Sequence, residues 1–167
     1  EPGRHDSASG APISTGFRGR YQQAVAQMDH QPDQARRALT TLHRERRDLT
    51  GPLVNLCILD FRAEETEAAK ACFDRVLASD PEQPDALNHL GVLARQEGEF
   101  GQAEDYYRQA LTAEPEHLAS IRNLGILLDL YQGRHQEALD LYQQYQALLP
   151  EPDPMVAQWV ADLKNRL

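Results

Sequence analysis

The sequence predicts an all-α protein built from stacked antiparallel helix pairs. Apolar residues follow helical spacing, and glycine and proline mark turns and helix ends at regular intervals. Four columns of residues also return every 34 or 35 positions, as a repeated helix–turn–helix unit requires. The columns are Leu56, Leu90 and Leu124; Ala69, Ala103 and Ala138; Phe73, Tyr107 and Tyr142; and Pro81, Pro115 and Pro150.

The unit at residues 84–117 shows the pattern most clearly. Its first helix ends near Gly98, because glycine readily takes the left-handed conformation that stops a helix. Small residues at Gly91 and Ala103 allow the two helices to approach closely, and the ring of Tyr107 fills the space beside them. Pro115 ends the second helix, since the residue before a proline avoids helical geometry.

These columns resemble the tetratricopeptide repeat, which has Leu-Gly, Ala, an aromatic residue and Pro at fixed places over 34 residues. The resemblance covers about residues 50–150 and implies a right-handed α-solenoid with units at 50–83, 84–117 and 118–152. The first unit departs from the pattern, because Cys57 replaces the glycine. The third unit holds one extra residue between Gly125 and Ala138, which we expect in the turn at "YQGRHQ".

Further segments flank the three units. Residues 17–48 are interpreted as a divergent helix pair with two apolar stripes: Tyr21, Ala24, Val25 and Met28, then Ala35, Leu39 and Leu42. Residues 153–167 are predicted to form a capping helix with Asp153 as N-cap and Pro154 at its first position. Its inward residues are expected to be Met155, Val156, Trp159, Val160 and Leu163. Residues 1–16 lack periodicity and are predicted to be a flexible tether.

The charge of the chain argues against duplex nucleic acid as a partner. The net charge is −9 and the pI is about 5.1, whereas binding to the phosphate backbone needs basic surface. A basic stretch nevertheless occupies residues 36–47. It is interpreted either as a solvated helix face or as a docking surface for an acidic partner or lipid headgroups.

The two cysteines, Cys57 and Cys72, are too few for a disulfide scaffold. Because they fall fifteen residues apart on paired helices, we expect buried free thiols. The alternative is a bridge, which requires both side chains to point inward.

The sequence gives no indication of catalysis. Six histidines lack metal-ligand spacing, and no nucleotide-binding or nucleophile motif occurs. We therefore expect a protein that is not an enzyme and that uses no cofactor and no metal.

The resemblance implies that the first helix of each pair lines an inner wall that binds another polypeptide. The candidate partner-binding residues, carried over by phase, are Val54, Asn55, Ile58, Phe61, Arg62, Asn88, His89, Val92, Arg95, Arg122, Asn123, Ile126 and Leu130. The same position in the three units is occupied by Asn55, His89 and Asn123. Side-chain amides there either pair with a bound peptide backbone or bond neighbouring helices.

The biological role expected from this resemblance is that of a scaffold. A short stack behind a Ser/Gly/Ala/Pro tether is similar to mature bacterial lipoproteins, including pilotins that escort secretin subunits. This reading implies a periplasmic protein, anchored to the outer membrane only through a lipid before Glu1, with a secretin or another envelope subunit as partner. The alternatives are a cytoplasmic adaptor or assembly chaperone, and an accessory subunit of an envelope enzyme complex.

Overall fold

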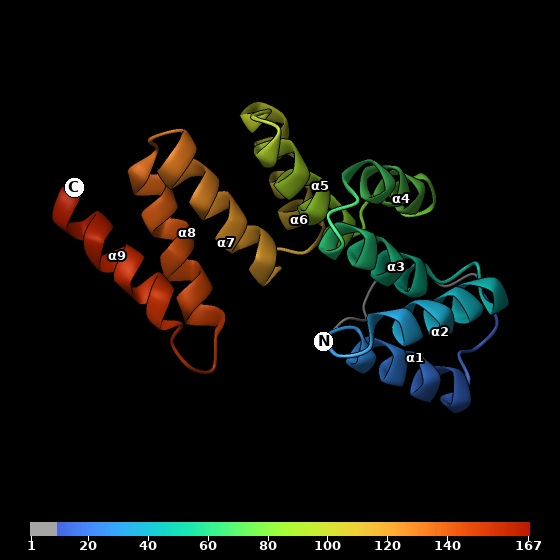
Figure 1. Ribbon diagram of the computed structural model, residues 1–167. Coiled ribbons are helices and arrows are strands. Elements are labelled where there is room, and N and C mark those ends of the chain that lie inside the picture. Colours follow the sequence, from blue (N-terminus) through green and yellow to red (C-terminus); the bar gives the residue numbers. More distant parts are fainter. Residues whose placement is uncertain (1–9) are drawn as a thin grey trace. The chain divides into compact units, whose positions relative to one another are not determined.

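The computed structural model describes residues 10–167, which contain nine α-helices and no strand (Figure 1). The helices are α1 Thr15–Gln27, α2 Pro32–Glu45, α3 Thr50–Arg62, α4 Thr66–Ser79, α5 Pro84–Gln96, α6 Phe100–Ala113, α7 Leu118–Ile126, α8 His135–Leu148 and α9 Pro154–Arg166. Residues 1–9 of the predicted tether lie outside the described residues. The first helix begins two residues earlier than predicted, because the Ser14 side chain accepts a hydrogen bond from the Phe17 amide.

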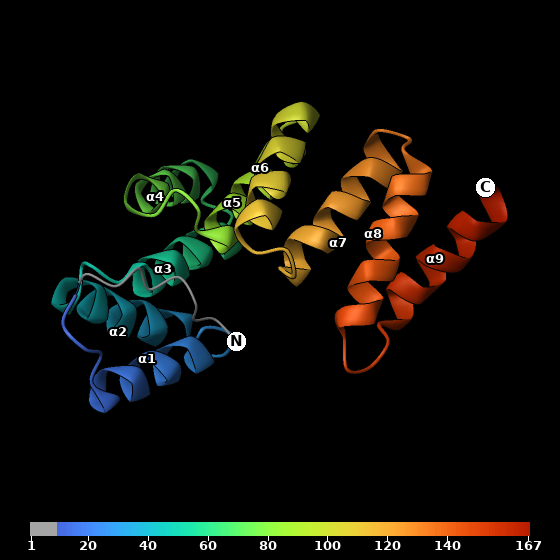
Figure 2. The ribbon, with the colours of Figure 1, turned by 180° about the vertical axis from the view of Figure 1, so that it is seen from behind.

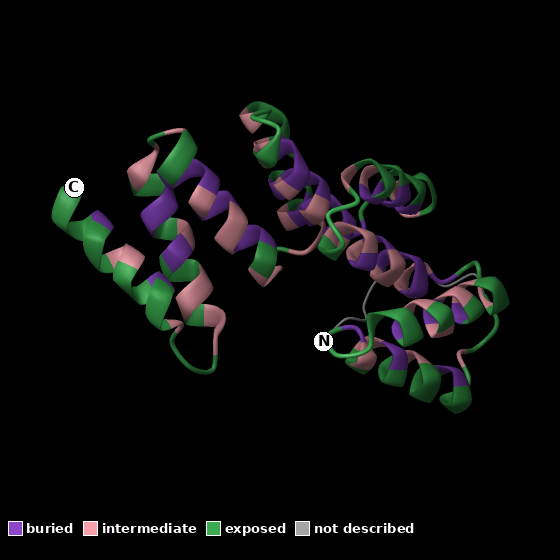
Figure 3. Ribbon diagram, in the orientation of Figure 1, coloured by how far each residue is buried: buried purple, intermediate pink, exposed green. Residues whose placement is uncertain are grey.

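The helices divide into two compact units, each with its own core. The N-terminal unit ends at Ala86 and the C-terminal unit begins at Leu87. Both views of the ribbon show the helices of a pair side by side, as for α1 and α2 or for α7 and α8 (Figures 1 and 2). Buried residues lie on the helix faces that meet neighbouring helices, whereas the outer faces are exposed (Figure 3).

The predicted apolar stripes of the divergent pair form the core of the N-terminal unit. Ala24 and Ala35 have no exposed surface, so α1 and α2 approach closely there. Tyr21 and Val25 pack against this core while they remain partly exposed. The buried members of the core are Phe17, Ala24, Met28, Ala35, Leu39, Leu42, Leu49 and Leu59.

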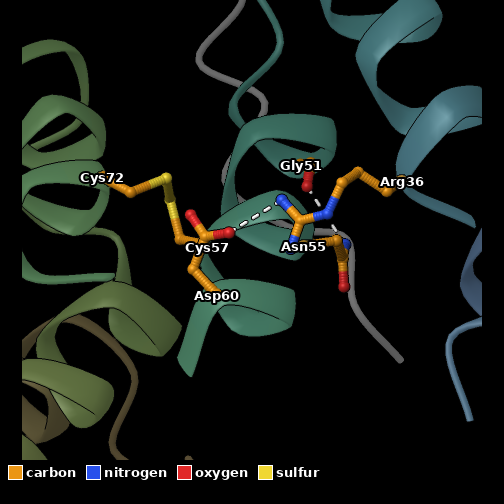
Figure 4. Close-up of a disulfide and its surroundings, with 6 residues drawn as sticks. All are labelled: Arg36, Gly51, Asn55, Cys57, Asp60 and Cys72. Carbon is orange, nitrogen blue, oxygen red and sulfur yellow. Dashed lines mark hydrogen bonds and ion pairs between the residues drawn. A yellow bond between two sulfur atoms is a disulfide. The ribbon is translucent and has the colours of Figure 1, made fainter. Parts of the chain in front are cut away.

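A disulfide joins the paired helices α3 and α4, contrary to the expectation of free thiols. Cys57 and Cys72 have Cα atoms 5.3 Å apart, which is within the range that a disulfide spans. Figure 4 shows the bond crossing from one helix to the other. Cys57 occupies the place of Gly91 and Gly125 in the later repeats, where the helices come closest. The expectation was wrong because both side chains point into this contact, which spacing alone does not reveal.

The glycines of the C-terminal unit lie directly against aromatic rings. A Cβ added to Gly91 would lie 2.5 Å from Tyr107 Cε1, and one added to Gly125 would lie 2.6 Å from Tyr142 Cε1. Only glycine therefore fits at these places without displacing a ring. The predicted position of the Tyr107 ring beside Gly91 is confirmed, Tyr142 and Gly125 repeat this contact, and both rings are almost fully buried.

The extra residue of the third repeat is absorbed by a helix and not by the following turn. A π-helical segment, η1 (Leu127–Tyr131), continues α7. Gly98 and Gly133 both have positive φ, of 83° and 65°, and so mark equivalent turn positions. The insertion therefore lies before Gly133, and the turn itself keeps its form. A π-turn accommodates one additional residue within a helix, which explains the wider spacing.

The C-terminal helix α9 covers the end of the C-terminal unit largely as predicted. The Asp153 carboxylate accepts hydrogen bonds from the amides of Met155 and Val156 at 2.9 and 3.3 Å, so its N-cap role is confirmed. Val156 and Leu163 are fully buried, and Trp159 and Val160 pack against the core. Met155 was wrongly predicted to face inward, because it begins the helix and is 56% exposed.

Candidate protein-binding surfaces

A polar network holds α5 and α7 together in the C-terminal unit. Asn88 is 4% exposed, and its Oδ1 accepts a hydrogen bond from Asn123 Nδ2 at 3.0 Å. Ser120 Oγ donates to the same oxygen at 3.4 Å and lies 2.8 Å from His117 Nδ1. In the N-terminal unit, the amide of Asn55 donates to Tyr21 Oη at 2.7 Å. Asn55 and Asn123 therefore both form hydrogen bonds to side chains of neighbouring helices. This is one of the two interpretations of the amide that recurs at this position of the repeat.

An apolar row lies beside this network. Arg122, Ile126 and Leu130 recur every four residues along α7 and η1, so they share one side of the helix. Val92 and Ile126 are partly buried and pack against the core, whereas Leu130 is 68% exposed. We call Val92, Ile126 and Leu130 the apolar row. A single exposed apolar side chain is common on protein surfaces, but several neighbouring ones form a patch that can mark an interaction site.

The end of α7 differs in polarity from the corresponding end of α5. Counted from the repeat glycines, Leu130 takes the place of Gln96 and Tyr131 takes the place of Glu97. Tyr131 is 48% exposed, and its ring centroid lies 4.9 Å from that of Phe100. The third repeat therefore presents apolar side chains where the second repeat presents polar ones.

Two arginines near the apolar row have buried donors without an acceptor among residues 10–167. These atoms are Arg95 Nη1 and Arg122 Nε. The Arg122 guanidinium lies 5.3 Å from the centroid of the Trp159 ring, which favours a cation there. Burial raises the pKa of Tyr107 to about 12, and the nearby charge of Arg95 opposes that rise. Both arginines are partly exposed, so their positive charge can attract a carboxylate of a bound chain.

The predicted partner-binding residues of the N-terminal unit differ in how far they are exposed. Ile58 and Phe61 are partly exposed, and Arg62 pairs with Asp29 at 2.8 Å. Val54 is only 3% exposed, and so, like Asn88, it has almost no surface to offer a partner. His89 in the C-terminal unit is partly exposed. Partner binding by the exposed members of the set stays a prediction.

A cleft of about 800 Å³ lies in the N-terminal unit, where the α1–α2 turn faces the end of α3. Arg62 is the only candidate residue that lines it. The phase argument missed the others because it considered only certain positions of the first helices, whereas most of the lining lies on α2 or in turns. The lining residues are Met28, Asp29, Pro32, Asp33, Arg36, Leu59, Arg62, Ala63 and Glu65.

The described part of the chain contains no group of three or more His, Cys, Asp or Glu side chains arranged to hold a metal. Within residues 10–167, no helix is both long and apolar enough to cross a membrane. The apolar row and the polar residues beside it present apolar, amide and guanidinium groups, which suit the binding of another polypeptide.

One curated relative matches part of the chain. It is a probable biofilm formation methyltransferase, WspC, of Pseudomonas aeruginosa, which is 35% identical over 81 residues. The match covers 48% of this chain and 19% of the relative. The chain therefore spans about a fifth of the length of that enzyme.

Solved structures share the fold at low sequence identity. Pseudomonas aeruginosa PilF superposes with a TM-score of 0.75 at 20% identity, over 90% of this chain and 68% of that one. The Yersinia enterocolitica type III secretion chaperone SycD, solved with a peptide of the translocator YopD, gives a TM-score of 0.60 at 17% identity. That match covers 68% of this chain and 91% of SycD.

The comparison with family models agrees with the repeated columns. A tetratricopeptide repeat model matches residues 58–117 and again residues 93–152, which together make up more than half of the chain. The helix pairs, the glycine–tyrosine contacts and the solved neighbours support the predicted α-solenoid class. The chain therefore belongs to the tetratricopeptide repeat family.

Proposed function

We propose that this protein is a noncatalytic scaffold whose C-terminal unit binds a segment of a partner protein along the apolar row. The observation that carries the proposal is the exposure of Leu130, at 68%, beside the partly exposed Ile126 and Val92. The SycD structure holds a bound peptide, which supports peptide binding as a use of this fold.

The chemistry of the surface defines the partner segment. Apolar side chains supply most of the affinity, because burying one contributes about 1.5–3 kcal/mol and a hydrogen bond about 0.5–1.5 kcal/mol. Arg95 and Arg122 are partly exposed and add positive charge near the apolar row. The segment therefore carries apolar residues together with at least one aspartate or glutamate.

A selection from a random peptide library, followed by affinity measurements on two variants, tests this proposal. Leu130→Glu places a carboxylate in the apolar row, whereas Met155→Glu changes a similarly exposed residue on α9. We expect selected peptides to be apolar and acidic. Leu130→Glu should weaken their binding by tenfold or more, on the order of 1.5 kcal/mol, because it leaves a charge against apolar surface. Met155→Glu should bind as the parent does. Equal binding by both variants would contradict the proposal.

The disulfide supports a finer proposal about the compartment. Disulfides persist in oxidising environments such as the bacterial periplasm and are rare in the cytosol. Cys57 and Cys72 are 0% and 7% exposed, so the bond lies in the core of the N-terminal unit. We propose a periplasmic envelope protein of the lipoprotein or pilotin type, with an envelope subunit such as a secretin as partner. Alkylation of the denatured protein from whole cells should find neither thiol free. Two free thiols would favour a cytoplasmic adaptor.

The likeness to WspC supports a second candidate function. Its 35% identity lies within a much longer enzyme, of which it covers 19%. The corresponding candidate is a docking module that serves an enzyme in the same chain or complex. Peptides selected on the C-terminal unit would then match sequences in that enzyme's partners and not sequences in a secretin.

A further inference from the structure

Four exposed arginines of the N-terminal unit lie on α2, directly after it, or on α4. Arg37 and Arg44 lie on α2, Arg47 follows it, and Arg75 lies on α4. We call these four residues the basic patch. They are exposed, and none of them makes an ion pair with another residue between 10 and 167. By contrast, four other arginines of this unit pair with carboxylates: Arg20 with Glu45, Arg36 with Asp60, Arg46 with Asp48, and Arg62 with Asp29.

His43 links the two helices of the basic patch. Its side chain is partly buried, and its Nδ1 atom is buried without a hydrogen-bond partner. Burial lowers the pKa of His43, and the charges of Arg75 and Arg47 lower it further. Arg47 follows α2 and Arg75 lies on α4, so charge from both parts of the basic patch acts on this imidazole. Arg37 and Arg44, seven residues apart, share the outward side of α2.

The patch lacks the apolar surface that a protein partner requires. Interface cores between proteins are depleted of charge and rich in aromatic residues. Around the patch, the exposed side chains include Thr41, Asp74 and Ala78, none of them large and apolar. An anionic membrane surface needs no apolar contact, since adjacent basic side chains are attracted by its field alone. Guanidinium groups also match phosphate oxygens in bidentate geometry.

We propose that the basic patch docks the N-terminal unit on the phosphate headgroups of an anionic lipid surface. The docking is peripheral and electrostatic, because no exposed apolar side chain of the patch enters the bilayer. Two exposed carboxylates weaken the local field, because Asp33 lies four residues before Arg37 on α2 and Asp74 lies beside Arg75. This inference uses a different unit from the peptide-binding surface, and it holds whether or not a lipid anchor precedes Glu1.

Vesicle sedimentation with the soluble chain tests the docking. The vesicles contain either equal amounts of phosphatidylglycerol and phosphatidylcholine, or phosphatidylcholine alone. We expect binding only to the anionic vesicles and a steep loss of binding as salt is added. Arg44→Gln/Arg47→Gln should weaken partitioning by about thirtyfold, because each arginine near such a surface contributes about fivefold.

A matched control removes the same charge elsewhere. Arg18→Gln/Lys164→Gln changes two exposed cations outside the patch and should alter partitioning by no more than about twofold. Unchanged thermal unfolding of both variants checks that the fold is intact. Equal losses in the two variants would overturn the proposal, because they would show nonspecific attraction.

Two further outcomes would also overturn the membrane assignment. In the first, inorganic phosphate raises the melting temperature of the parent but not of the patch variant, while anionic vesicles fail to bind. The patch would then serve a free phosphate. In the second, poly-glutamate binds through the patch while vesicles do not, which would identify an acidic protein as the partner. Neither outcome bears on peptide selection by the C-terminal unit.

Discussion

At the scale of single residues, the packing of the third repeat depends on the absence of a side chain at Gly125. Its Cα faces the Tyr142 ring, and an added Cβ would lie 2.6 and 2.9 Å from two ring carbons. The ring is 1% exposed and has core side chains around it, so it has little room to move. The glycine column of the family is therefore a steric requirement of the helix pair and not a requirement for an unusual backbone conformation.

Gly125→Ala tests this steric requirement. The substitution should destabilise the protein by about 1–3 kcal/mol, because overpacking forces the ring or the backbone to shift. Gly19→Ala is the control, since Gly19 lies within α1 and a Cβ added there would have no atom within 4 Å. It should stabilise by about 0.5–1 kcal/mol through helix propensity. Urea denaturation measures both changes, and effects of the same sign would disprove the steric account.

At the scale of elements, the disulfide replaces a packing contact found in the other repeats. Gly91 and Gly125 each receive an aromatic ring, whereas Cys57 is bonded to Cys72 on the partner helix. The first repeat also has Glu64 where the later turns have glycine, and Glu64 is held at a φ of 59°. A non-glycine residue in the left-handed region costs about 1–2 kcal/mol. The covalent bond therefore stabilises the repeat whose sequence departs most from the pattern.

Removal of the disulfide should destabilise the N-terminal unit. A bridge closing a fifteen-residue loop contributes about 3 kcal/mol. Cys57→Ala/Cys72→Ala should lower the free energy of unfolding by about that amount, and the C-terminal unit should keep its stability. Hydrogen exchange resolved by peptide separates the two units. If protection from exchange falls only in residues after Leu87, or does not fall at all, the disulfide does not stabilise the N-terminal unit.

At the scale of the whole molecule, sequence periodicity predicts what depends on local spacing. The helix pairs, the left-handed turn at Gly98 and the N-cap at Asp153 were predicted correctly because each follows from residues near one another in the chain. The disulfide, the π-helical segment and the cleft were not, because they depend on which side chains meet across helices. Asn123 illustrates this limit: its place was known, but its bond to Asn88 required coordinates.

The candidate site is predictable only in part for the same reason. Phase identified Ile126 and Leu130, but it also included Val54 and Asn88, which the fold buries. Leu130 lies within η1, and its counterpart in the second repeat, Gln96, is exposed as well, so the repeat phase places this exposed position correctly. Periodicity does not predict the apolar character of this position, which the third repeat does not share with the second.

We propose that the apolar row of the C-terminal unit receives a polypeptide segment. The most direct test is a nuclear magnetic resonance titration of the labelled chain with a peptide selected from the library. We predict that the largest shift changes fall on Val92, Ile126 and Leu130 and on the side chains of Arg95 and Arg122. Changes centred on the α1–α2 cleft, or on α9 around Met155, would contradict the claim.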